Sequence, residues 1–83
     1  MEIKFVKGLN VFLAPKEIAK PFMKKLKAPK GYSVLGEKTK LGMIKQKLSK
    51  KENLIIYSHN KEIINLANGL HCIGKKEIVS LRV

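Results

Sequence analysis

The sequence predicts a small α+β domain with one mixed sheet and helices packed on one face of it, in the element order ββα(β)αβαββ. Three segments repeat apolar residues at helical spacing, and shorter apolar runs between them have the length and alternation of strands. A chain of 83 residues is too short to divide into two stable cores. We therefore expect residues 1–83 to form a single α+β domain, which an apolar fraction of 45% can support.

The first expected elements are a β-hairpin and a helix. Over residues 2–14, Ile3 and Phe5 alternate with polar neighbours and a second apolar run follows, which predicts a hairpin with one buried face. Pro15 suits the first position of a helix over residues 15–27. Pro21 is expected to kink this helix on its polar side. The apolar stripe of the helix consists of Ile18, Ala19, Phe22, Met23 and Leu26.

The middle of the chain predicts a strand, a helix and a second strand. Residues 30–36 are bounded by glycines and indicate a short strand. A helix is expected over residues 38–49, with a buried stripe of Leu41, Ile44 and Leu48. Residues 54–57 form a continuous apolar run, which predicts a central strand because a strand buried on both faces loses the alternation of polar and apolar residues.

The last third predicts a helix between strands. Asn60 is a good N-cap, and Asn68-Gly69 is a good stop for the helix that it begins. We assign the apolar face of this helix to Ile63, Leu66, Ala67 and Leu70. With a strand at residues 70–73, residues 53–73 form a βαβ unit whose crossover should be right-handed.

A final strand is expected over residues 77–83, after a turn at Gly74-Lys75-Lys76. Ile78, Ser80 and Arg82 should share one face of this strand, and Val79, Leu81 and Val83 the other. On this assignment Ile56, Leu66 and Leu81 lie in one core.

The charge of the chain favours an anionic partner. Eighteen Lys plus Arg stand against six acidic residues, which gives a formal net charge of +12. Only Arg82 is an arginine, so the cations suit contact with a backbone better than the reading of base edges. The six glutamates are scattered and there is no aspartate, so we expect no metal-dependent phosphodiester chemistry, no metal site and no cofactor. Lysine enrichment from an AT-rich genome is the alternative explanation.

Two lysine-rich helices are the candidate nucleic-acid-binding surface, for DNA or RNA. The predicted contacts are Lys38, Lys40, Lys45, Lys47, Lys50 and Lys51 around the second helix, Lys20, Lys24 and Lys27 along the first, and Tyr32 as a ring on which a base stacks. Two basic helices on one side of a sheet would form a platform or groove. Lysines that border an apolar stripe also lay their alkyl stems over the core, and a tyrosine in a turn also packs on the rim of a core.

The turn Ser58-His59-Asn60 is the best candidate for an active site. It follows a predicted central strand and begins a helix, which is where open α/β sheets place ligands. His59 can act as a general acid or base and Cys72 as a nucleophile, but the sequence places no orienting carboxylate beside them. His71 is expected on the strand face opposite Cys72. An N-cap, a surface histidine and a buried cysteine are the ordinary interpretation.

Location and partners follow from what the sequence lacks. No apolar run is long enough to cross a bilayer, and the first residues lack the apolar region of a signal peptide, so we expect no integral membrane association. With one cysteine, the expected location is the cytoplasm, or the host cell cytoplasm for a viral protein.

The leading hypothesis is a nucleic-acid-binding protein with little sequence specificity. The second is a protein-interaction module or subunit in which residues 77–83 pair with a partner or a second copy. The third is a small enzyme centred on His59.

Overall fold

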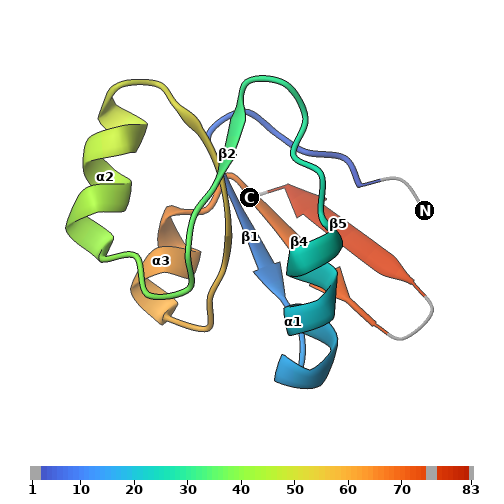
Figure 1. Ribbon diagram of the computed structural model, residues 1–83. Coiled ribbons are helices and arrows are strands. Elements are labelled where there is room, and N and C mark those ends of the chain that lie inside the picture. The colour runs from blue at the N-terminus through green and yellow to red at the C-terminus, as the bar shows by residue number, and fades with distance from the viewer. Residues whose placement is uncertain (1–2, 75–76, 83) are drawn as a thin grey trace.

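The computed structural model describes residues 3–74 and 77–82 and confirms an α+β domain with a mixed sheet (Figure 1). The elements are β1 (Leu9–Leu13), α1 (Lys16–Lys25), β2 (Tyr32–Val34), α2 (Leu41–Ser49), β3 (Asn53–Tyr57), α3 (Lys61–Leu66), β4 (Gly69–Ile73) and β5 (Ile78–Arg82). Glu2, the turn residues Lys75 and Lys76, and Val83 belong to predicted elements but lie outside the described residues. Among the described residues, no helix is long and apolar enough to span a bilayer.

The sheet is built around β1. Its strand order is β2-β3-β1-β4-β5, with the first four strands parallel and β5 antiparallel to β4. The structure confirms the predicted strands within residues 30–36, 54–57, 70–73 and 77–83 as β2, β3, β4 and β5. In the unit at residues 53–73, β1 lies between β3 and β4 and pairs with both.

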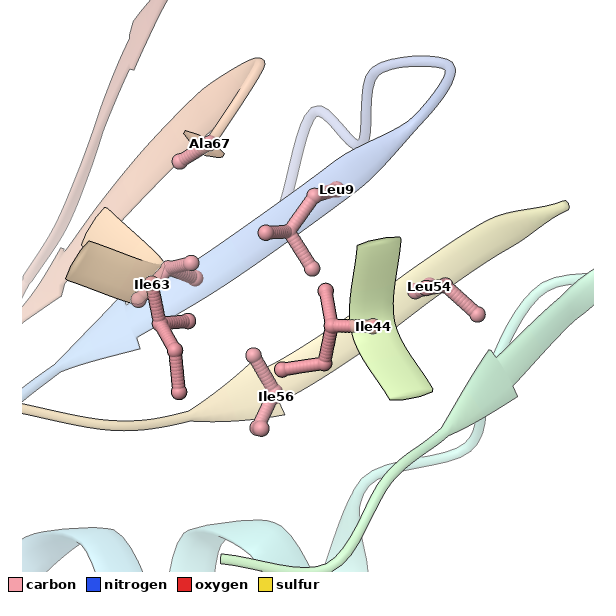
Figure 2. Close-up of a cluster of buried hydrophobic side chains, with 7 residues drawn as sticks. Leu9, Ile44, Leu54, Ile56, Ile63 and Ala67 are labelled. Atoms are coloured by element: carbon pink, nitrogen blue, oxygen red, sulfur yellow. The ribbon is translucent and has the colours of Figure 1, made fainter. Parts of the chain in front are cut away.

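Helices cover both faces of the sheet, not one face as the sequence suggested. Ile44 of α2 and Ile63 of α3 pack on Leu9, Leu54 and Ile56 (Figure 2). The apolar residues of α1 pack on the other face, where β1 and β3 present Phe12, Ala14, Ile55 and Tyr57. The reason is the alternation of side chains along a strand, because the interior strands β1 and β3 place apolar side chains on both faces of the sheet, and both faces need cover.

The predicted hairpin over residues 2–14 is wrong. One strand, β1, runs through the second half of that segment, and residues 3–6 form no strand. The alternation of Ile3 and Phe5 reflects packing, because Phe5 lies over Phe12 and His71 with ring centroids 6.0 and 5.6 Å away. The segment before β1 therefore covers the sheet and does not extend it.

Three asparagine side chains hold the backbone before β1. Asn53 Oδ1 accepts from the amide of Gly8 at 2.9 Å, and Asn68 Oδ1 accepts from the amide of Leu9 at 3.0 Å. Asn10, which is fully buried, accepts from the amide of Val6 at 2.9 Å. These side chains accept the hydrogen bonds that a partner strand of the predicted hairpin would have accepted. The side chain of Asn68 therefore binds the backbone of β1 and does not cap the end of α3.

Asn10 also fixes the protonation of a buried histidine. Its Oδ1 faces the Val6 amide and can only accept, so His71 Nε2, 2.9 Å away, must carry a proton. Burial lowers the pKa of His71 and so favours the neutral ring, in which the other nitrogen, Nδ1, accepts from the Ser80 hydroxyl at 2.8 Å. Gly69 makes room for this arrangement, since a Cβ there would lie 2.7 Å from the side chain of Val6. The network joins β1, β4 and β5.

The helices are shorter than predicted, and their buried stripes are confirmed except for Leu70 of the third helix. Helix α1 begins after Pro15, α2 begins at Leu41, and α3 ends at Leu66. Lys38 and Lys40 therefore precede α2, with Lys40 as its N-cap. The Asn60 side chain caps α3 by accepting from the Glu62 amide at 2.9 Å, as predicted. Leu70, which was expected on the apolar face of the third helix, lies in β4.

Truncation of Ile56 should destabilise the protein far more than truncation of Leu81. Ile56 is fully buried and Leu66 packs beside it, whereas Leu81 is 52% exposed, so the expected common core of these three residues is wrong for Leu81. We expect Ile56→Ala to cost about 2 to 4 kcal/mol in urea unfolding. Leu81→Ala should cost less than about 1 kcal/mol. Equal losses would contradict the observed core.

Stability should fall as the pH drops below about 6.5, because His71 is neutral in the fold. Burial lowers the pKa of His71 below its usual value of 6.5. The unfolded chain therefore binds the proton first, and the free energy of unfolding decreases from pH 6.5 down to the lowered pKa, by at most about 1.4 kcal/mol per pH unit. Urea unfolding between pH 5 and 8 measures this slope. A His71→Gln variant should show a smaller slope over the same window.

Candidate nucleic-acid interface

A hollow of about 600 Å³ lies between α1 and the segment that leaves β2. Its floor includes Ala19 and Tyr57, which are almost fully buried. Its remaining lining comes from one side of α1 and from the end of β2, and consists of Lys20, Pro21, Met23, Lys24, Val34, Leu35, Gly36 and Glu37. Most of these side chains are apolar, so the hollow offers apolar walls with charged groups among them.

The path of the chain explains the position of the hollow. Val34 and Tyr57 are the last residues of β2 and β3, two neighbouring parallel strands, so their carboxyl ends meet at one edge of the sheet. The chain leaves β1 through α1 on one face and leaves β3 through α3 on the other. Ligands of open α/β sheets bind beyond the carboxyl ends of strands where the connections diverge in this way.

Lysines line the solvent-exposed side of α1. Lys16, Lys20 and Lys24 are exposed and follow one another at intervals of one helical turn, about 6 Å along the axis. Two of them, Lys20 and Lys24, also line the hollow. Glu37 on the opposite wall is the carboxylate of the hollow. One end of the hollow is therefore cationic and the other carries a negative charge.

The carboxyl ends of β1 and β3 are joined by a tyrosine and a histidine. The Tyr57 hydroxyl lies 3.1 Å from the Ala14 carbonyl and 2.9 Å from His59 Nε2, which itself lies 3.0 Å from that carbonyl. Because a carbonyl only accepts, the bond from His59 requires a proton on Nε2. Burial, followed by the carboxylates of Glu37 and Glu17, raises the pKa of the Tyr57 hydroxyl above its usual value of 10.0. At neutral pH the hydroxyl keeps its proton and donates a hydrogen bond to the Ala14 carbonyl.

The predicted lysine contacts are divided between two faces of the sheet. Lys20 and Lys24 lie on α1 over one face, with Lys27 just beyond its end. The second group lies on and around α2, over the other face of the sheet, so the two helices do not form the expected common platform. This second group consists of Lys38, Lys40, Lys45, Lys47, Lys50 and Lys51. Lys47 lies 3.8 Å from Glu52 in a half-exposed ion pair.

The aromatic residues are mostly committed to packing. Tyr32 is half-buried with its ring centroid 5.8 Å from that of Phe5, which favours the interpretation of a tyrosine packed on the rim. Phe12 and Phe22 lie on core faces, as predicted, with centroids 5.3 Å apart. Tyr57 is only 5% exposed. Stacking of bases on exposed rings thus receives little support among the described residues.

The turn after β3 does not assemble a catalytic group within the described residues. The hydrogen bonds of His59 run to Tyr57 and Ala14, neither of which is a carboxylate or a thiol. Cys72 is half-buried on β4. His71 is bonded to Asn10 and Ser80 in the network beneath Phe5. In residues 3–74 and 77–82, no cluster of three His, Cys or acidic side chains is placed to hold a metal ion.

The sequence did not point to the second wall of the hollow. In the sequence, this wall resembles the end of a short strand followed by a loop; it consists of Val34, Leu35, Gly36 and Glu37. Their importance depends on β2 lying parallel to β3, which brings them to the same edge as Tyr57. The one available signal was the apolar Val34-Leu35 pair followed directly by glycine and an acidic residue.

Comparisons of the chain with protein-family models, with curated proteins and with solved structures found no match. An activity must therefore be inferred from the residues themselves.

Loss of the Tyr57 hydroxyl should destabilise the fold by about 0.5 to 1.5 kcal/mol. In Tyr57→Phe the Ala14 carbonyl keeps its bond from His59, which limits the cost. In the double variant with His59→Ala that carbonyl loses both partners, so its cost should exceed the sum of the single costs. A urea-unfolding double-mutant cycle measures this coupling, and strictly additive costs would contradict the arrangement.

Proposed function

We propose that the protein binds nucleic acid through lysines that contact the phosphate backbone, with α1 and its adjoining hollow as the principal contact surface. The observation that carries this proposal is the row of Lys16, Lys20 and Lys24 along the exposed side of α1. Phosphates recur every several ångströms along a nucleic-acid strand, so lysines about 6 Å apart can follow them. We also propose that the protein acts in the cytoplasm, as the sequence predicts.

The balance of charges supports an external anionic partner. The chain has eighteen cationic and six acidic residues, and the described part of it contains one ion pair, Lys47 with Glu52. Internal pairing therefore neutralises little of the positive charge. Repulsion among unpaired cations opposes the compact state, and counterions or a polyanion relieve it.

The α1 surface is favoured over the α2 surface for two reasons. Lys20 and Lys24 of α1 border one hollow, whereas Lys47 of α2 forms an ion pair with Glu52 at 3.8 Å. Helix α2 also exposes an uncharged side chain, Met43, which is 53% exposed. A hollow of about 560 Å³ does adjoin the end of α2, but no lysine within α2 lines it. Its lining consists of Lys7, Gly8, Leu48, Lys51, Glu52, Asn53 and Asn68.

Removal of the α1 lysines should reduce the salt dependence of binding. We expect Lys16→Gln, Lys20→Gln and Lys24→Gln together to lower the slope of log affinity against log salt by about 2 to 3 units, since each lost contact contributes about 0.7 on a single strand and about 0.9 on a duplex. Glutamine retains helix propensity, so the fold should survive. Fluorescence anisotropy with random-sequence strands at several salt concentrations measures the slope.

The matched control removes three exposed lysines from the opposite face. Lys45→Gln, Lys50→Gln and Lys51→Gln change the net charge by the same amount but lie on and beyond α2. This variant should alter the slope by less than about 1 unit. Equal effects of the two triple variants would mean that the charge acts as a diffuse field, and no binding by the wild-type protein near physiological salt would overturn the proposal.

Strand pairing at β5 is a second candidate function. This strand lies at the edge of the sheet, and Val79 and Leu81 on it are 45% and 52% exposed. An edge strand with exposed apolar residues can pair with another chain. Sedimentation equilibrium distinguishes the candidates, because pairing predicts a concentration-dependent dimer that Leu81→Lys abolishes. A monomer at all concentrations would exclude self-pairing.

A further inference from the structure

We infer that the hollow beside α1 holds one unstacked base of a single-stranded nucleic acid, while Lys20 and Lys24 hold the phosphates that flank that base. This inference rests on the proposed function and narrows it to a class of ligand. It follows from the shape of the hollow, the chemistry of its walls and the arrangement of its charges.

The size and lining of the hollow suit a nucleotide. A volume of about 600 Å³ lies in the range of small-molecule sites, about 300 to 1,000 Å³. Met23 and Pro21 on α1 and Val34 and Leu35 at the end of β2 supply apolar side chains on the two walls. Apolar side chains on both sides of an extruded base replace the neighbours that it leaves in a stack. A phosphate alone would gain nothing from these walls.

Charge complementarity fixes the orientation. Lys20 and Lys24 are exposed lysines one helical turn apart, so their ammonium groups can reach phosphates outside the hollow while the base enters it. Glu37 on the other wall repels phosphate and attracts hydrogen-bond donors. The edge of the base should therefore lie toward Glu37 and the sugar-phosphate toward α1.

Glu37 also implies a preference among bases. A carboxylate only accepts hydrogen bonds, and the exocyclic amines of cytosine, adenine and guanine are donors that it can use. Thymine and uracil present a carbonyl oxygen at the corresponding position. The hollow should therefore favour amine-bearing bases, although the phosphate contacts are indifferent to sequence.

The experiment compares three labelled strands of twelve nucleotides by fluorescence anisotropy, namely oligo(dC), oligo(dT) and a strand of abasic deoxyribose phosphates. Stacking of a base contributes at least about fivefold in affinity, so the abasic strand should bind at least about fivefold more weakly than oligo(dC) at equal salt. Oligo(dT) should lie between them. The salt slopes of the three strands should be the same, because the phosphate contacts are shared.

Two matched pairs of variants test the position of the base. Gly36 lines the hollow and a Cβ there meets no atom within 4 Å, so we expect the leucine of Gly36→Leu to narrow the hollow. This variant should reduce the affinity for oligo(dC) toward that for the abasic strand while the salt slope stays unchanged. The control Gly42→Leu on α2 also meets no atom within 4 Å and should have no such effect. Glu37→Gln should remove the preference for oligo(dC) over oligo(dT), and Glu62→Gln on α3, with the same charge change, should preserve it.

Each failure has a separate meaning. If the abasic strand binds as tightly as oligo(dC) with a steep salt dependence, the base site is wrong and the backbone proposal stands. If none of the three strands binds near physiological salt, both proposals fail. If free cytidine monophosphate binds as tightly as oligo(dC) and competes with it, the occupant is a free nucleotide and the inference of a strand is wrong.

Discussion

The structure depends on a middle strand that is buried on both faces and bonded on both edges. Leu9 and Val11 face α2 and α3, while Phe12 faces α1, so helices must cover both sides of β1. The chain reaches this strand from a segment without a strand partner, and buried amides there need acceptors. Asn10, Asn53 and Asn68 supply them. Every other strand takes its position from β1, either directly or through β3 and β4.

Asn10 carries the most constrained part of this arrangement. It is bonded to Val6 before β1, to the Leu54 carbonyl on β3 and to His71 on β4, and all of its hydrogen-bonding groups have partners. A buried network of this kind stabilises one register only while it is fully satisfied. It also requires a proton on Nε2 of His71, and burial lowers the pKa of this histidine, which connects the packing of the sheet to pH.

Much of the fold could be predicted from sequence because the strong signals are local. The continuous run at residues 54–57, the N-cap at Asn60 and the buried stripe around Ile44 were found as they stand. The failures concern contacts distant in sequence. The alternation of Ile3 and Phe5 resembles a strand, and nothing local reveals that Asn53 and Asn68 satisfy the backbone in place of a partner strand. The two covered faces follow from a topology that a linear pattern does not contain.

The candidate site was predictable only in its charge. Lys20 and Lys24 were among the expected contacts, but they were grouped with lysines of α2 that lie over the opposite face of the sheet. The other wall depends on the parallel pairing of β2 with β3, which places Glu37 near the carboxyl end of a strand that follows it by about twenty residues in the chain. Charge can be counted in a sequence, whereas a hollow with a cationic and an anionic end requires the arrangement of three elements.

The most direct measurement of the proposed surface is a titration of ¹⁵N-labelled protein with a single-stranded oligonucleotide, followed by backbone amide chemical shifts. The largest changes should fall at residues 19–24 and 34–37, on the two walls of the hollow, and residues 41–49 of α2 should change little. Changes centred on residues 41–49, or confined to residues 78–82 of the edge strand, would contradict the assignment of the α1 surface.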